Sequence, residues 1–249
     1  MLEPSVIAPL ADSGAALLRA KLHVFGLVEG EVDQRLALID SAVANDSPLT
    51  IAPNSEIHVT LTAPIGQNAM LEEARTAARQ QLGHFVFAES DEDFTDCVVA
   101  LLKSSKQTLA TAESCTGGLV GDLITDIPGS SEIFVGGVVA YSNAVKESLL
   151  GVNSQILVEH GAVSEATVLE MARGVKKRLH SDIGLAISGI AGPGGGTPDK
   201  PVGTLWFAVV SAQSEKTLHL KLPFERRRNK VIAAYSGLDL VRHSLSQQD

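Results

Sequence analysis

The residues of this chain best suited to chemistry lie in one short stretch, Thr111-Ala112-Glu113-Ser114-Cys115-Thr116-Gly117-Gly118. An apolar run typical of a strand precedes it, and a run with helical spacing, residues 119–124, follows it. A hydroxyl group at such a strand-to-helix turn lies beside free helical N–H groups, which can hold a developing negative charge. Ser114 is therefore a candidate nucleophile. The alternative is that Ser114 or Thr116 only caps the helix, as Ser and Thr commonly do.

A lysine follows the next predicted strand, residues 133–140. Ser142 or Asn143 can cap the helix that comes next, which places Lys146 in its first turn. The positive field of the helix N-terminus, together with burial, would lower the pKa of this lysine. A neutral lysine amine can act as a general base toward a serine hydroxyl. The alternative for Lys146 is a solvated surface side chain.

A glycine-rich loop follows a third predicted strand, residues 183–187, and begins at Ser188. It holds five glycines between positions 189 and 196, which let backbone N–H groups approach an anion without a side-chain clash. Neither the P-loop nor the dinucleotide-binding fingerprint fits it, and a merely mobile loop is the alternative. Ser114, Lys146 and Ser188 all lie at or just beyond the ends of predicted strands. Open α/β sheets bind ligands at that edge, so we expect these three loops to converge there.

The elements that must position these loops indicate an α/β domain over residues 89–249. Its predicted strands, 133–140, 183–187 and 203–210, are almost continuously apolar, which is typical of a sheet covered by helices on both faces. Helices are expected over residues 164–179, capped by Ser164, and from Pro223 to about residue 246. We therefore predict a three-layer α/β/α architecture.

Residues 20–88 predict a separate, small α+β domain with the element order β-α-β-β-α-β, a split-βαβ, KH-like pattern. The predicted ranges are strands 22–27, 49–51, 57–62 and 84–87, with helices 31–43 and 68–82. This part is acidic and lacks a Gly-x-x-Gly loop, so RNA binding is not expected. It offers no catalytic cluster, and an interaction or spacer role is the default. The domain boundary is placed near residue 89, and we expect residues 1–19 to be an N-terminal tail or the remnant of a preceding domain.

Charge and composition exclude several classes of function. The net charge of −9 and a pI near 5.3 argue against nucleic acid or an anionic membrane as the main partner. Two cysteines, Cys97 and Cys115, form no disulfide framework, so a cytoplasmic setting is expected. No apolar run reaches the length needed to span a bilayer. The seven histidines show no recognisable metal spacing, and we expect no metal site.

Five motifs occur in order along the second part of the chain: Ala112-Glu113-Ser114-Cys115-Thr116-Gly117-Gly118, Pro128-Gly129-Ser130-Ser131, Gly136-Gly137-Val138-Val139-Ala140-Tyr141-Ser142-Asn143 with Lys146, His160-Gly161-Ala162-Val163-Ser164, and Gly189-Ile190-Ala191-Gly192-Pro193-Gly194-Gly195 with Pro201-Val202-Gly203-Thr204. Through them, residues from about 92 to 245 resemble the C-terminal domain of the CinA family. Characterised members of that family are nicotinamide mononucleotide deamidases, the PncC activity. Residues 20–88 resemble the KH-like middle domain of full-length CinA.

The resemblance implies a serine hydrolase with Ser114 as nucleophile, Lys146 as general base and Tyr141 as a proton-relay or positioning group. The implied reaction converts the carboxamide of nicotinamide mononucleotide into nicotinate mononucleotide and ammonia, without a metal or cofactor. The glycine-rich loop would line the nucleotide site, with Ser188 near the reacting group. The resemblance also implies a homo-oligomer. Candidate substrate-binding residues are Thr116, Gly117, Ser188, Gly189, Gly192, Gly194, Gly195 and Arg228.

One segment departs from the family pattern. Where the family has Phe-x-Gly-Asp-Arg before its last helix, this chain has Phe224-Glu225-Arg226-Arg227-Arg228. The family arginine maps to Arg228, which we expect to bind the substrate phosphate with help from Arg226 or Arg227 and from the positive helix end. A catalytically silent relative that acts as a binding or assembly module is the alternative, because the family is linked by name to competence and DNA damage. The presence of Ser114, Tyr141 and Lys146 favours the enzyme.

Overall fold

The computed structural model describes residues 17–39, 48–52 and 54–245. The chain divides into two compact units, Met1–Phe94 and Thr95–Asp249. Most of the expected N-terminal tail, residues 1–16, and the end of the first predicted helix, residues 40–43, lie outside the described residues.

The first unit has the predicted order of elements. They are β1 (Leu17–Val24), α1 (Glu29–Leu36), β2 (Leu49–Ile51), β3 (Ile57–Pro64), α3 (Asn68–Leu82), the short 3-10 turn η1 (Gly83–Phe85) and β4 (Val86–Ala88). Antiparallel pairing gives the strand order β2-β3-β1-β4. Several predicted boundaries were wrong. The first strand runs from Leu17 to Val24 rather than over residues 22–27, so it takes in the last residues of the expected tail. The first helix ends at Leu36 rather than running on through residue 39, and the last strand begins at Val86, after η1.

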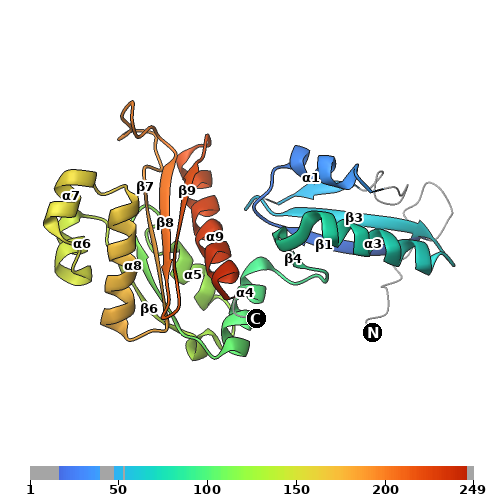
Figure 1. The fold of residues 1–249 in the computed structure, drawn as a ribbon, viewed down its shortest axis with the longest axis horizontal. Coiled ribbons are helices and arrows are strands. Elements are labelled where there is room, and N and C mark those ends of the chain that lie inside the picture. The colour runs from blue at the N-terminus through green and yellow to red at the C-terminus, as the bar shows by residue number, and fades with distance from the viewer. Residues whose placement is uncertain (1–16, 40–47, 53, 246–249) are drawn as a thin grey trace. The chain divides into compact units, whose positions relative to one another are not determined.

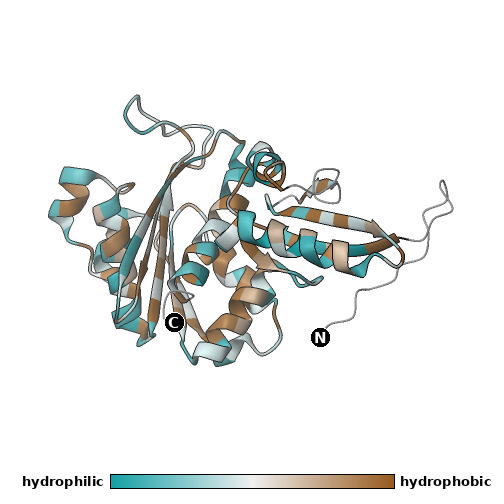
Figure 2. Cartoon of the chain, turned by 45° about the vertical axis from the view of Figure 1, so that its right-hand side comes forward, coloured by the Kyte–Doolittle hydropathy of each residue, from teal (hydrophilic) through white to brown (hydrophobic). Residues whose placement is uncertain are grey.

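Amphipathic patterning explains the core of this unit. Alternate residues of β3 are buried, so one face of the strand packs inward. The helix α3 buries four residues at helical spacing, Leu71, Ala74, Ala78 and Leu82, and leaves its hydrophilic side chains outside. Figure 2 shows both kinds of residue along this helix.

The second unit contains a five-stranded sheet with the order β6-β5-β7-β8-β9. Its elements are α4 (Phe94–Ser105), β5 (Leu109–Glu113), α5 (Leu119–Thr125), the 3-10 turn η2 (Ser130–Glu132), β6 (Phe134–Val139), α6 (Asn143–Leu150), α7 (Ser154–His160), α8 (Glu165–Leu179), β7 (Ile183–Gly189), β8 (Thr204–Val210), β9 (Glu215–Lys221) and α9 (Arg226–Leu245). Figure 1 shows α8 on one face of the sheet and α5 and α9 on the other. The predicted α/β architecture is confirmed.

The strand directions bring the candidate loops to one edge of the sheet. The strands β5, β6 and β7 run parallel, so their carboxyl ends lie side by side. The strand β8 is antiparallel to β7, so the glycine-rich connection between them leaves and re-enters the sheet at that same edge. Ser114 after β5, Lys146 at the start of α6 and Ser188 near the end of β7 therefore converge, as the strand pattern predicts, although Lys146 and Ser188 lie within the helix and the strand rather than on loops.

Candidate active site

Ser114 is the first residue after β5, and the sheet still holds its backbone. Its N–H donates to the carbonyl of Ile187 on β7 at 2.9 Å, and the residue is 8% exposed. Gly117 and Gly118 turn the chain from β5 into α5 with φ values of 67° and 96°. That left-handed region strains residues with a side chain, so this turn requires glycine.

Glu113, which precedes Ser114, holds the turn from inside. Its buried carboxylate accepts hydrogen bonds from the N–H groups of Gly118, Val120 and Gly121 at 3.0, 3.1 and 3.0 Å. These are donors at the start of α5 that were expected to be free to stabilise negative charge. That expectation was wrong for these three groups, because the protein's own carboxylate already occupies them. Sequence reasoning assigned no role to Glu113.

Lys146 reaches Ser114 from the neighbouring element. Its Nζ donates to Ser114 Oγ at 3.2 Å and to the carbonyl oxygen of Ala140 at 2.7 Å. Ser142 Oγ accepts from the N–H of Val145 at 3.3 Å, which confirms the predicted cap and places Lys146 in the first turns of α6. The lysine is only 1% exposed, and this burial lowers its pKa. A solvated surface lysine is thereby ruled out.

The thiol of Cys115, next to Ser114, is held in its neutral, unreactive form. Cys115 is 5% exposed, and burial raises its pKa to about 12. The thiol is therefore protonated at neutral pH, and it is the thiolate that acts as a nucleophile. Lys146 is near enough to affect the charge of both side chains, and its hydrogen bond goes to the hydroxyl of Ser114.

Ser114 and Lys146 open into a cavity of about 260 Å³. Besides Ser114 and Lys146, six of the predicted site residues line it: Tyr141, Ser188, Gly189, Gly192, Gly194 and Gly195. Its other lining residues are Cys115, Ala162, Val163, Ile190, Ala191 and Arg226.

Three predicted substrate contacts, Thr116, Gly117 and Arg228, are not part of the cavity lining. Thr116 is buried under the turn at 1% exposure. Gly117 lies close to Lys230 instead: if Gly117 carried a side chain, its Cβ would lie 3.7 Å from Nζ of Lys230.

Two predicted polar contacts have partners within the protein. The hydroxyl of Ser188 donates to the carbonyl oxygen of Ala162 at 2.7 Å, which fixes the opposite wall of the cavity. Tyr141 is 64% exposed, and its hydroxyl accepts a hydrogen bond from Arg226 at 3.2 Å rather than contacting Ser114 or Lys146. Its role in proton relay or positioning stays a prediction.

Arg226 takes the place at the cavity that was expected for Arg228. The guanidinium of Arg226 donates to the carbonyl oxygen of Gly192 at 2.7 Å and to Tyr141. That of Arg228 instead stacks over the ring of Phe224, 4.1 Å from its centre. The N-terminus of α9 was expected to add positive charge. However, the Glu225 carboxylate already accepts hydrogen bonds from the backbone N–H groups of Arg227 and Arg228, the second and third residues of the helix, at 2.7 and 2.6 Å. The structure thus corrects two parts of the phosphate prediction: Arg226 rather than Arg228 lines the cavity, and two N–H groups at the start of α9 already have a carboxylate acceptor.

Metal sites and membrane spans can both be assessed for residues 17–39, 48–52 and 54–245. No group of three or more His, Cys, Asp or Glu side chains in that part of the chain could hold a metal ion. Over the same residues, no helix combines the length and the apolar character that crossing a bilayer requires.

Comparison with known proteins places this chain in a family. The model of the CinA C-terminal domain matches residues 91–245. A CinA-like protein from Synechococcus sp. (strain CC9902) is 39% identical over 96% of this chain and 58% of the relative. A solved structure of competence/damage inducible protein CihA from Agrobacterium tumefaciens matches with a TM-score of 0.60 and 33% identity, over 62% of this chain and 94% of that one.

A competence or damage-inducible protein from Enterobacter asburiae is similar, with a TM-score of 0.59 and 32% identity over 61% of this chain and 96% of its own. The chain spans about three fifths of the length of the curated relatives it matches.

Proposed function

Because the chain belongs to the CinA family, we propose that its second unit hydrolyses the carboxamide of nicotinamide mononucleotide to nicotinate mononucleotide and ammonia. The observation that carries the proposal is the 3.2 Å contact between Lys146 Nζ and Ser114 Oγ at the cavity. A buried amine with a lowered pKa beside a serine hydroxyl is the arrangement that a serine amidohydrolase with a lysine base requires.

The first half-reaction forms an ester. Neutral Lys146 takes the proton of Ser114 Oγ as this oxygen attacks the carboxamide carbon. In the neutral amine one N–H can stay on the carbonyl of Ala140 at 2.7 Å, while the lone pair accepts the serine proton across the 3.2 Å contact. As the tetrahedral intermediate collapses, the C–N bond breaks, and the lysine ammonium gives its proton to the departing nitrogen to form ammonia.

The second half-reaction regenerates the enzyme. A water molecule attacks the acyl carbon and loses a proton to Lys146, the bond to Ser114 Oγ breaks, and the protonated lysine returns the proton to that oxygen.

The negative charge on the substrate oxygen needs donors other than the start of α5, where Glu113 occupies three N–H groups. The N–H of Cys115, the residue after the nucleophile, is the first candidate, since Cys115 lines the cavity.

The size and charge of the cavity suit this substrate. Small-molecule sites commonly measure about 300–1,000 Å³, so a cavity of about 260 Å³ fits the pyridine ring and its amide better than a whole nucleotide. The ribose and phosphate would then extend along the glycine-rich loop. Arg226 lies beside this loop, where it donates a hydrogen bond to the carbonyl of Gly192. A guanidinium can bind a phosphate through two parallel hydrogen bonds.

The test is the release of ammonia from nicotinamide mononucleotide by the purified chain, with the nicotinate product identified by mass. Free nicotinamide is the control, because it has the amide and lacks both the ribose and the phosphate that Arg226 would bind. We expect turnover of the nucleotide and much slower turnover of the free base. The absence of ammonia release from a folded sample would refute the proposal and favour the catalytically silent alternative.

A further inference from the structure

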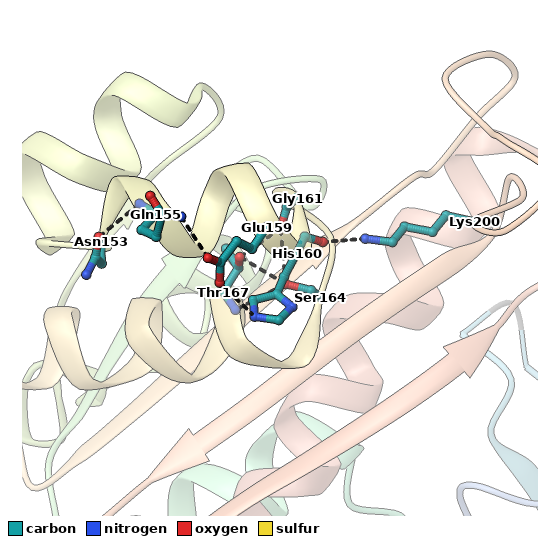
Figure 3. A network of polar contacts seen from close by, with 8 residues as sticks. All are labelled: Asn153, Gln155, Glu159, His160, Gly161, Ser164, Thr167 and Lys200. Carbon is teal, nitrogen blue, oxygen red and sulfur yellow. Dashed lines mark hydrogen bonds and ion pairs between the residues drawn. The ribbon is translucent and has the colours of Figure 1, made fainter.

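Lys200 is a cation that the reaction does not use, and it joins the two walls of the cavity. One wall is the turn of residues 160–164 between α7 and α8, which contributes Ala162 and Val163. The other is the glycine-rich loop, which contributes Gly192, Gly194 and Gly195. Lys200 lies near the end of that loop, and its Nζ donates to the carbonyl oxygen of His160 at 2.6 Å (Figure 3). The same Nζ donates to the carbonyl oxygen of Val163 at 2.8 Å.

The backbone of Lys200 is itself held by hydrogen bonds to Thr197 within the loop. The N–H of Thr197 donates to the carbonyl of Lys200 at 2.9 Å, and Thr197 Oγ1 accepts from the N–H of Lys200 at 3.0 Å. This reciprocal pair closes a small turn that presents the lysine toward the opposite wall. In Figure 3 the side chain extends across to the carbonyl of His160 at the end of α7.

Side chains bind every carbonyl from residue 160 to residue 163. Lys200 takes the first and the last, and the hydroxyls of Ser164 and Thr167 donate to Gly161 at 3.0 and 2.8 Å. Ser188 donates to the remaining one, that of Ala162, at 2.7 Å. These bonds constrain the turn, and among their donors Lys200 is the one that comes from the glycine-rich connection, because Ser188 lies within β7.

We infer that Lys200 is a positioning residue that locks the glycine-rich loop onto the 160–164 turn and so fixes both substrate-facing walls of the cavity. The inference rests on the proposed function for its catalytic consequence, but not for the lock itself. Backbone carbonyls bind a cation through charge-assisted hydrogen bonds, which are stronger than neutral ones. A loop with five glycines has much conformational freedom to lose, so two such bonds near its end matter more there than on a helix.

Three variants test the lock: Lys200→Met, Lys200→Arg and, as a matched control, Lys177→Met, which removes an exposed lysine of α8. Amide hydrogen exchange is measured by mass spectrometry on peptides covering residues 160–164 and 190–200. In Lys200→Met we expect exchange in both segments to be faster by roughly fivefold or more, because each wall loses its tie to the other. Lys200→Arg should restore most of the protection, since arginine can donate to both carbonyls. Unchanged exchange, or a change in one segment only, would overturn the inference.

The kinetic readout tests what the lock does. With nicotinamide mononucleotide as substrate, Lys200→Met should lower kcat/KM by about ten- to a hundredfold, mainly through KM, because a misplaced wall loses aligned contacts. The pH midpoint set by Lys146 should stay in place. Faster exchange with unchanged kinetics would refute the positioning role. If the unmodified chain releases no ammonia, the proposed function fails, while the exchange measurement still decides whether Lys200 locks the walls.

Discussion

Replacing Glu113 tests how far the reacting serine depends on a carboxylate that never meets substrate. Glu113 is 2% exposed and accepts three backbone hydrogen bonds at 3.0–3.1 Å. Net contributions of about 1.5–3 kcal/mol per hydrogen bond to a charged group would add to roughly 4–9 kcal/mol for Glu113→Ala. Two of the donors, Gly118 and Gly121, are only partly buried, and water can replace their acceptor. We therefore expect a loss of about 3–5 kcal/mol in the free energy of unfolding.

The glutamine variant separates the charge from the shape. In Glu113→Gln one oxygen can still serve Gly118 and Val120, whereas the amide NH₂ would face the N–H of Gly121. The loss should be about 1 kcal/mol, the low end of the cost of a donor left without an acceptor, because the N–H of Gly121 is only partly buried. Turnover should fall by about tenfold or more in both variants, because Ser114 adjoins the residue that is changed.

The chain supplies its own probe for this measurement. Its single tryptophan, Trp206, lies on β8, so urea unfolding followed by tryptophan fluorescence reports on the second unit. The control is Glu159→Gln, which removes the charge of an exposed carboxylate on α7. If Glu113→Ala unfolds within about 1 kcal/mol of the unmodified chain, as surface substitutions usually do, the carboxylate does not hold the turn and the reasoning is refuted.

Three further predictions follow from the site. Ser114→Ala should lower turnover by on the order of a thousandfold or more, while Cys115→Ala retains it; the reverse result in an ammonia assay would indicate a thiol hydrolase. Activity should rise with pH through the pKa of Lys146, which burial lowers, and fall away below it, because the protonated amine cannot accept a proton; a pH–rate profile checks this, and an active Lys146→Arg would exclude the role. Arg226→Ala should lower kcat/KM for nicotinamide mononucleotide by about ten- to a hundredfold, with little effect on a substrate without phosphate. Arg228→Ala should change kcat/KM for either substrate by less than about threefold. Equal losses in the two variants would contradict the geometry.

The positions of Ser114 and Lys146 could be predicted because each follows a strongly apolar strand, and the ends of parallel strands share one edge. The carboxylates of Glu113 and Glu225 were not predictable in the same way. An acidic residue beside a turn points either to water or back onto the N–H groups of the next helix, and sequence alone does not distinguish these directions. Both point back here, and this changed the expected electrostatics of the site.

The arginines show a different limit. Consecutive residues of a helix point about 100° apart, so three in a row face three directions. Choosing the one that faces the cavity requires the first residue of α9 and the orientation of the helix, which the sequence does not give. The strand β9 was missed for a third reason: it is a largely polar edge strand, so it lacks the continuous apolar run of the central strands.

The antiparallel step from β7 to β8 has a consequence for how such a site can change. Gly189 pairs with Leu205, so the two ends of the glycine-rich loop stay on neighbouring strands whatever lies between them. Closing a loop costs only about 0.6 kcal/mol more when its length doubles. Ser114 directly follows β5 and Lys146 lies on α6, on the other side of β7. Insertions, deletions or whole-loop exchanges between Gly189 and Leu205 can therefore alter which substrates enter while the reacting pair stays in place, which makes this segment the natural place to engineer a new specificity.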